Sequence, residues 1–279
     1  MHWQTSRHLI DLSRPRLMGI VNVTPDSFSD GGRYASTRAA VEHCEKLLVD
    51  GAHILDIGGE SSRPGTPPVP LDEELARVLP VLREAVTLGV PVSVDTYKPE
   101  VMREALEIGA DIINDIWALR RPGAREAVAS HPQCGVCLMH MHGEPQTMQR
   151  SPMEGDAVPQ VLEFLNEATR ALRALGVDAS RIAWDPGIGF GKTVEQNFAL
   201  LARQHELVAG GYPLVAGWSR KSSLGNVTGL PVDERLAPSI AAALLAVERG
   251  ARVVRVHDVK ETLAALQVHA AMMSASEDV

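Results

Sequence analysis

Residues 92–114 read VSVDTYKPEVMREALEIGADIIN, and this stretch decides the fold. A short apolar run, Val92 to Asp95, ends in a carboxylate, and a second run, Ile112 to Asn114, ends in an amide. Between them, Pro99 to Ile108 carries apolar residues at helical spacing and is followed by Gly109, a residue that commonly ends helices. The stretch therefore predicts two buried parallel strands joined by a helix.

The same unit repeats along the chain, eight times in all. The other predicted strands are Leu17 to Asn22, Ile54 to Asp56, Val136 to Met139, Ile182 to Asp185, Leu214 to Ser219 and Val253 to Arg255. The other predicted helices are the segment of Val41, Cys44, Leu47 and Leu48 that stops at Gly51, then Leu71 to Leu88, Gly123 to Ser130, Val158 to Leu175, Val194 to Val208, Glu234 to Arg249 and Val259 to Met272. Eight such units in 279 residues predict a single (β/α)8 TIM barrel, for which roughly 250 residues are typical. The alternative is a doubly wound open sheet.

Polar residues gather at the predicted strand ends. In a barrel these ends meet at one face, where active sites of this architecture lie. The residues at or just beyond the ends are Asn22, Asp56, Asp95, Asn114, Asp185, Lys221, Arg255 and His257. One such carboxylate could simply cap a helix, but eight polar residues together predict a site.

Composition limits the partners. The chain is 45% hydrophobic and has no Ser/Gly/Pro-rich linker, so residues 1–279 are predicted to form one domain. A net charge of −8 without a basic run argues against nucleic acid or an acidic membrane surface as partner.

The longest apolar stretch, Ile240 to Val247, is too short to cross a bilayer, and the N-terminus has no signal-peptide core. We expect a cytoplasmic protein with a short N-terminal extension and a frayed acidic C-terminal tail, residues 274–279.

Cys134 and Cys137 form a C-x-x-C pair with His140 and His142 nearby, but a lone pair is a weak indication of zinc or redox chemistry. Cys137 lies inside an apolar strand, where a free cysteine behaves as a small buried hydrophobe. A structural role is therefore favoured.

Two long segments rich in Gly, Pro and Ser follow the first two predicted strands. They read TPDSFSDGGRY (24–34) and GGESSRPGTPPVP (58–70), and long loops above a rigid scaffold commonly carry binding residues. In the second loop, Arg63 has a planar donor fork that suits a carboxylate or phosphate. The loops are expected to be lids at the reactive face.

At this point the motifs carry a family resemblance. In order along the chain they are NVTPDSFSDGG, DIGGESSRPG, SVDTYKPEV, GADIINDI, CLMHMHGEPQTMQ, DPGIGFGKT, SRKSSLG and RVHDVKET. From Leu17 to about Leu266, this set resembles the dihydropteroate synthase family of pterin-binding barrels. The resemblance implies the condensation of 6-hydroxymethyl-7,8-dihydropterin pyrophosphate with 4-aminobenzoate, a magnesium cofactor and a homodimer.

The resemblance also implies the site residues. Asp185 is our choice to accept the two parallel N–H donors of the pterin ring, and the residues around the rest of the ring are Asp95, Asn114, Lys221 and Arg255. The pyrophosphate would be bound by Asn22, Arg255 and His257, with Asn22 giving magnesium an oxygen ligand. Arg255 and His257 alternate along the chain, so in a strand they project to the same side.

Departure of pyrophosphate would leave a cation on the methylene carbon, so a dissociative displacement needs no obvious general base. We expect Asp30 to stabilise this positive charge, with Lys221 and Arg255 as the other catalytic groups. By family resemblance, aminobenzoate would bind against Phe28 and Pro64, with Ser62, Arg63 and Ser222 nearby.

The segment GFGKT resembles a phosphate-binding loop, but that pattern requires a glycine where Pro186 stands. Gly187, Gly189 and Gly191 indicate either close backbone approach beneath the pterin or an ordinary tight turn.

Two other functions stay open: a catalytically silent pterin-binding paralogue, and a methyltetrahydrofolate-dependent methyltransferase. The combination of Arg63, Lys221 and Arg255 with both loop motifs disfavours the second.

Overall fold

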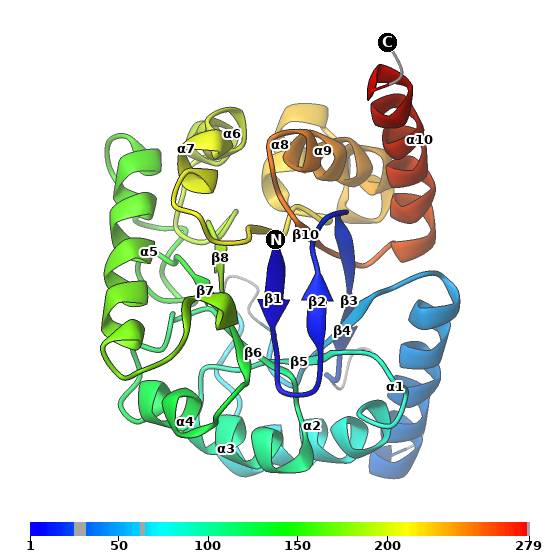
Figure 1. Cartoon of the computed structure of the whole chain (residues 1–279), viewed down its shortest axis with the longest axis vertical. Coiled ribbons are helices and arrows are strands. Elements are labelled where there is room, and N and C mark those ends of the chain that lie inside the picture. The colour runs from blue at the N-terminus through cyan, green and yellow to red at the C-terminus, as the bar shows by residue number, and fades with distance from the viewer. Residues whose placement is uncertain (25–31, 62–64, 278–279) are drawn as a thin grey trace.

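The computed structural model describes residues 1–24, 32–61 and 65–277 (Figure 1). Eight parallel strands follow one another in the order β8-β7-β6-β5-β4-β3-β10-β9, and a bridge between Trp184 and Leu214 joins the two edges. The strands are β3 (Arg16–Asn22), β4 (Ile54–Gly58), β5 (Val92–Asp95), β6 (Ile112–Asp115), β7 (Gly135–Met139), β8 (Ile182–Asp185), β9 (Val215–Ala216) and β10 (Val253–Val256). The sheet closes into a barrel, which confirms the predicted (β/α)8 fold and excludes the open sheet.

Helices surround the barrel (Figure 1). They are α1 (Gly32–Val49), α2 (Leu71–Ala85), α3 (Pro99–Ile108), α4 (Ala124–Ser130), α5 (Ala157–Arg173), α6 (Val194–Ala202), α7 (Gln204–Val208), α8 (Ser222–Thr228), α9 (Leu236–Glu248) and α10 (Val259–Glu277), with short 3-10 turns η2 (Ala179–Arg181) and η3 (Val232–Glu234). Within the described residues, none of these helices combines the length and apolar character needed to span a bilayer.

Several details differ from the prediction. The helix expected at 194–208 is broken at Arg203, whose backbone is not helical, and β9 covers only part of the expected strand. Helix α8 was not predicted at all. Helix α10 continues past Met272 as far as Glu277, because Ala, Met and Glu favour helix.

Side-chain alternation along the strands positions the site. Apolar side chains fill the end of the barrel nearest the strand starts; they are Met18, Ile54, Ile112, Cys137, Ala183, Val215 and Val253. Since successive side chains alternate between the two faces, the residue two positions further along each strand also points inward. Asp56, Asn114, Asp185 and Arg255 occupy such positions, so the strand ends present polar groups to the interior.

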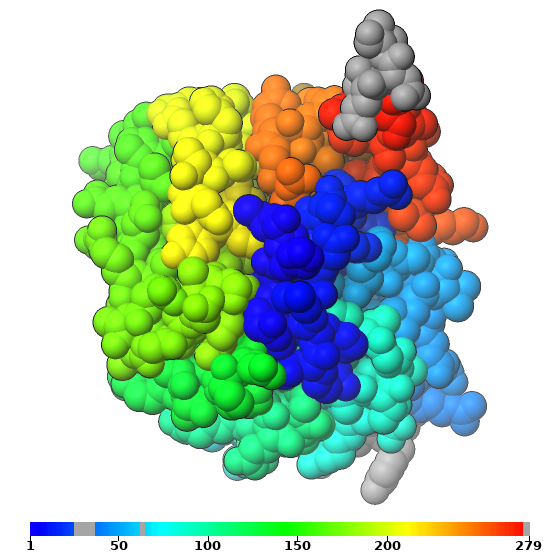
Figure 2. All heavy atoms as spheres, viewed as in Figure 1, coloured from blue at the N-terminus to red at the C-terminus, as the bar shows by residue number. Residues whose placement is uncertain are grey.

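An antiparallel hairpin of β1 (His2–Gln4) and β2 (Leu9–Asp11) precedes the barrel, where only an extension was expected. Trp3, which is fully buried, packs with Ile10 and Leu12 against the apolar barrel interior. In Figures 1 and 2 the hairpin crosses the face of the barrel that is turned to the viewer. It covers the end at which the strands begin, which leaves the opposite end for ligands.

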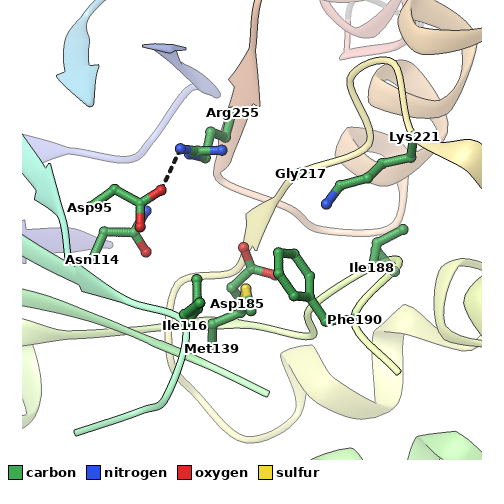
Figure 3. A pocket seen from close by; sticks show the side chains of 10 residues that line it. All are labelled: Asp95, Asn114, Ile116, Met139, Asp185, Ile188, Phe190, Gly217, Lys221 and Arg255. Atoms are coloured by element: carbon green, nitrogen blue, oxygen red, sulfur yellow. Dashed lines mark hydrogen bonds and ion pairs between the residues drawn. The ribbon is translucent and has the colours of Figure 1, made fainter. Parts of the chain in front are cut away.

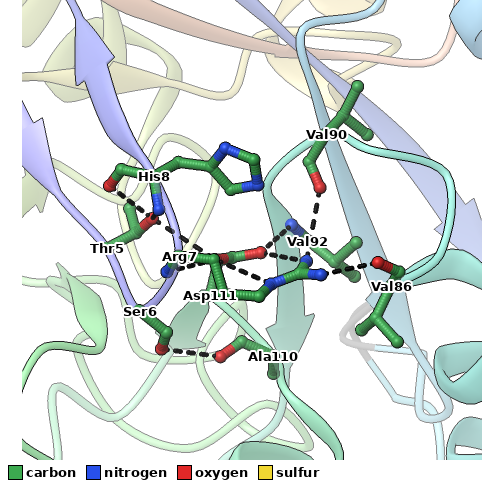
Figure 4. A network of polar contacts seen from close by, with 9 residues as sticks. All are labelled: Thr5, Ser6, Arg7, His8, Val86, Val90, Val92, Ala110 and Asp111. Atoms are coloured by element: carbon green, nitrogen blue, oxygen red, sulfur yellow. Dashed lines mark hydrogen bonds and ion pairs between the residues drawn. The ribbon is translucent and has the colours of Figure 1, made fainter.

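An arginine between the two hairpin strands ties this cover to the barrel (Figure 4). Arg7 donates from Nη2 to Oδ2 of Asp111 at 2.5 Å and from Nη1 to the Val86 carbonyl at 2.5 Å. The Asp111 carboxylate is fully buried and also accepts the backbone N–H groups of Arg7 and Val92, at 2.9 and 3.0 Å. The cover is therefore attached through a buried charge.

Replacing Arg7 by Met is expected to lower the free energy of unfolding by about 1–3 kcal/mol, because a buried carboxylate then lacks its cation, although partial exposure of Arg7 moderates the loss. Urea denaturation measures this change. Arg38→Met, which breaks an exposed pair with Glu42, is the matched control and should change stability by less than about 0.5 kcal/mol. Equal effects of the two substitutions would contradict a special role for Arg7.

Candidate active site

The carboxyl ends of the strands surround a pocket whose empty space, including the part open to solvent, is about 370 Å³ (Figure 3). Its lining residues are Asp95, Asn114, Ile116, Met139, Asp185, Ile188, Phe190, Gly217, Lys221 and Arg255. All five residues predicted to surround a pterin are in this set, although they come from five different strand ends. Figure 3 shows Asp185 between Asp95 and Asn114 on one side and Lys221 on the other.

Arg255 is held between two carboxylates inside the barrel. It donates from Nε to Oδ2 of Asp56 at 2.6 Å and from Nη2 to Oδ2 of Asp95 at 2.7 Å. Asp56 is fully buried and also accepts from the Asn114 amide, at 3.3 Å. The two aspartates therefore orient the guanidinium.

Burial raises the pKa of Asp95 to about 7, even though Arg255 favours its ionised form. The neighbouring Asp56 carboxylate adds to the increase. The two aspartates raise the pKa of Arg255 in turn, and this outweighs the opposing effect of burial. Asp95 is thus a group that can accept or donate a hydrogen bond near neutral pH.

Asp185 and Lys221 face the same pocket, but among the described residues no ion pair joins them. The Asp185 carboxylate accepts the backbone N–H of Gly187 at 2.7 Å, and the Lys221 ammonium lies 4.2 Å from the centre of the Phe190 ring. Burial raises the pKa of Asp185 and lowers that of Lys221 to about 8, while the charge of each opposes the shift of the other. Asp185 and Lys221 therefore do not form a structural salt bridge, and both are available to bind a ligand.

The residues predicted to bind pyrophosphate lie at the neighbouring strand ends. Asn22 ends β3, and His257 follows β10, which pairs with β3. The Nδ1 atom of His257 lies 2.9 Å from the hydroxyl oxygen of Ser219, which also accepts the backbone N–H of His257 at 3.2 Å. Ser219, which was not among the predicted site residues, thereby orients the imidazole.

Five predicted site residues lie outside the described residues: Phe28, Asp30, Ser62, Arg63 and Pro64. Of the predicted aminobenzoate residues, only Ser222 is described. It is exposed at the first position of α8, directly after Lys221, and is not part of the pocket lining.

Sequence reasoning missed the apolar part of the pocket. Ile116 and Met139 each lie two residues beyond an inward-facing strand residue, so alternation finds Met139 within its predicted strand and Ile116 just past the end of its own. Ile188 and Phe190 come from the turn after β8, and their positions could not be read from strand periodicity. Asp56 ends a predicted strand, but the sequence gives no indication of its pairing with Arg255.

Two of the glycines after β8, Gly187 and Gly191, permit close contact with neighbouring backbone. Gly187 and Gly191 have φ values of 68° and 67°, and a Cβ atom there would lie 1.8 Å from the carbonyl oxygen of His140 and 2.2 Å from that of His142. The turn is therefore packed tightly against the end of β7. The tight-turn interpretation describes these two positions better than close approach to a pterin.

The cysteines have structural surroundings. Cys44, Cys134 and Cys137 are all buried and free, and burial raises the pKa of each thiol, that of Cys44 to about 12. In the described part of the chain, no three His, Cys, Asp or Glu side chains gather as a metal site. The structural interpretation of the C-x-x-C pair thus fits its environment.

Comparison with known proteins agrees with the geometry. The family model described as "Pterin binding enzyme" matches residues 18–257. The dihydropteroate synthase of Neisseria meningitidis serogroup B is 49% identical over 276 residues, which cover 97% of each chain. Among solved structures, Burkholderia cenocepacia dihydropteroate synthase complexed with 7,8-dihydropteroate has a TM-score of 0.91 and 51% identity, covering 100% of this chain and 98% of the other. The Xanthomonas albilineans enzyme with 4-aminobenzoic acid has a TM-score of 0.91 and 48% identity, covering 98% and 99%. The chain therefore belongs to the pterin-binding enzyme family and, within that family of barrels, to the transferases known as dihydropteroate synthases.

Proposed function

We propose that this protein condenses 6-hydroxymethyl-7,8-dihydropterin pyrophosphate with 4-aminobenzoate, giving 7,8-dihydropteroate and pyrophosphate. The observation that carries the proposal is the pocket itself, in which Asp185 lies between Asn114 and Lys221, and Lys221 and Arg255 supply positive charge. Relatives of similar sequence and fold were crystallised with 7,8-dihydropteroate and with 4-aminobenzoic acid, which are the product and one substrate of this reaction.

The pterin end of the substrate would be recognised by hydrogen bonds at the pocket floor. Asp185, when ionised, accepts both the ring N–H and the exocyclic amino group, which are parallel donors. Lys221 donates to the ring carbonyl oxygen, and Asn114 and Asp95 pair with the remaining nitrogen atoms. Each of these groups is costly to bury unpaired, so a ligand that satisfies them all gains affinity and specificity together.

The pyrophosphate end would lie at the rim, near Arg255 and His257. A leaving group that gains negative charge departs more readily when cations contact it, and Arg255 is already oriented by Asp56 and Asp95. Asn22 offers one amide oxygen beside these residues. That donor set suits a magnesium ion held mainly by phosphate oxygens and water, which would neutralise part of the leaving charge when bound.

In the proposed reaction the C–O bond to pyrophosphate breaks first and leaves the cation on the methylene carbon. The aminobenzoate nitrogen then donates its lone pair to that carbon, and the proton it loses passes to solvent. Asp30 would stabilise the cation, and Phe28, Ser62, Arg63, Pro64 and Ser222 would hold the aminobenzoate.

We also propose a cytoplasmic homodimer. Exposed apolar side chains occur on α8, α9 and α10; they are Val227, Leu236, Leu245, Val268, Met272 and Met273. Apolar residues that share neighbouring helices favour association with a second copy. Light scattering during size-exclusion chromatography would show twice the chain mass if this is right, and the mass of one chain if it is not.

An assay with both substrates and magnesium tests the reaction. Purified protein is expected to release pyrophosphate only when 4-aminobenzoate is present, and reactions without it serve as the control. Pterin binding without such release would favour a catalytically silent paralogue. Methyl transfer from methyltetrahydrofolate would instead favour a methyltransferase.

A further inference from the structure

Lys192, which the proposed reaction does not use, is a buried cation without a carboxylate partner. Its side chain is only 3% exposed, and within the described residues no ion pair includes it. The ammonium donates to three backbone carbonyls, those of Gly187 at 2.8 Å, Phe190 at 3.2 Å and His140 at 3.4 Å. A lysine buried in this way costs free energy, so its retention needs an explanation.

Two of these carbonyls, those of Gly187 and Phe190, belong to the turn after β8, and the third, that of His140, directly follows β7. The carbonyl of Gly187 also accepts the backbone N–H of Phe190 at 3.1 Å, and the N–H of Gly187 donates to the Asp185 carboxylate at 2.7 Å. Ile188 and Phe190, on the same turn, line the pocket (Figure 3). Lys192 thus fixes the segment that carries part of the pocket floor and that hydrogen-bonds Asp185.

Charge gives Lys192 a second effect on Asp185. The cations that act on the Asp185 carboxylate are Lys221 and Arg255, which line the pocket, and Lys192, which is not part of the lining. From β4, β5 and β7, the other titratable groups inside the barrel are Asp56, Asp95 and Cys137. Burial raises the pKa of Asp185, and Lys192 is one of the groups that opposes this increase.

The pKa of Lys192 is lowered to about 7 by burial, against the attraction of Asp185. Its positive charge is therefore fullest on the acid side of neutrality. In the same acidic range a nearby positive charge matters most for Asp185, because it favours the ionised carboxylate. Protonation would convert one of the two acceptors of Asp185 into a donor.

We propose that Lys192 is a positioning residue for the pterin, whose ammonium holds the turn from Gly187 to Phe190 beneath the ring and keeps Asp185 an acceptor. The proposal rests on the function proposed above, and deepens it. Lys192 itself lies below the pocket lining and acts through Asp185 and the turn.

Arg181 provides a matched control at the opposite end of β8. It is 5% exposed and, like Lys192, donates to backbone carbonyls, those of Cys134 at 2.7 Å, Val128 at 3.0 Å and Pro132 at 3.2 Å. Removing either cation should therefore lower the free energy of unfolding by a similar amount. Only the removal of Lys192 should change the affinity for the pterin.

The experiment is to measure the affinity of 6-hydroxymethyl-7,8-dihydropterin by calorimetry across the neutral range, for the wild-type protein, Lys192→Met and Arg181→Met. For Lys192→Met we expect a loss of about tenfold near pH 6, which shrinks to threefold or less near pH 8.5, because Asp185 is ionised there in either protein. Arg181→Met should keep the wild-type pH profile.

Should Lys192→Met fail to fold, Lys192→Gln takes its place, since an amide still donates to two carbonyls but carries no charge. A loss of affinity that is equal at all pH values, or no loss, would overturn the positioning role, as would the same pH-dependent loss in Arg181→Met. Absence of binding by the wild-type protein would instead count against the proposed function itself.

Discussion

Asp185→Asn is expected to weaken dihydropterin binding by about 100- to 1,000-fold, or about 3–4 kcal/mol. The carboxylate presents two acceptors to the two parallel donors of the ring, whereas the amide presents one acceptor and one donor, so an N–H would face an N–H. The cations Lys221 and Lys192 would also lose the negative charge that they now share. Calorimetry with 6-hydroxymethyl-7,8-dihydropterin measures the change.

Asp178→Asn is the control for this substitution, because Asp178 is an exposed aspartate just before the same strand and should leave affinity unchanged. The Asp185→Asn variant should in addition lose the decline in affinity that protonation of Asp185 causes at acid pH. Binding by Asp185→Asn within threefold of wild type would remove Asp185 from pterin recognition.

Arg255→Met should lower kcat/KM by about 100- to 1,000-fold, because a cation placed where charge develops on the leaving group is lost. It should also lower the free energy of unfolding by about 3 kcal/mol, since the buried carboxylates of Asp56 and Asp95 lose their shared partner. Steady-state kinetics and urea denaturation measure the two effects separately.

A pH test follows from Asp95, whose pKa of about 7 in the folded protein exceeds its ordinary value of 3.8. A carboxyl with a raised pKa takes up protons that the unfolded chain does not, so its contribution to stability falls as pH rises between these two values. Without Arg255 the pKa rises further. Arg255→Met should therefore regain part of its lost stability when the pH is lowered from about 8 to about 6.

The double variant Arg255→Met/Asp56→Asn separates folding from chemistry. Removing one buried carboxylate should recover part of the lost stability and none of the lost activity. If activity returned together with stability, Arg255 would be a structural residue, and the proposed role at the pyrophosphate would be wrong.

The barrel was predictable because its strands are buried on both faces and read as short apolar runs. Val92–Asp95 and Ile182–Asp185 were predicted with their observed bounds, and so was helix Pro99–Ile108, which carries a clear apolar face. Helix α8 was missed because SSLGNVT contains a glycine and few apolar residues. The hairpin was missed because each of its strands has only three residues.

The site was predictable to the extent that it lies at strand ends. Strand ends together with the family resemblance placed five residues in one region, and all five line the pocket: Asp95, Asn114, Asp185, Lys221 and Arg255. Pairings across the barrel could not be read from spacing, because Asp56 and Arg255 are 199 residues apart. The role of Lys192 was equally hidden, since its partners are backbone carbonyls that any residue could supply.

The terminal hairpin has a practical consequence for handling the molecule. Met1 is half exposed on the sealed side of the cylinder, away from the mouth where small molecules would enter. An affinity tag attached there should orient every molecule on a sensor surface with its opening toward the solution. Deleting the first dozen amino acids would instead expose apolar side chains of the interior and promote aggregation.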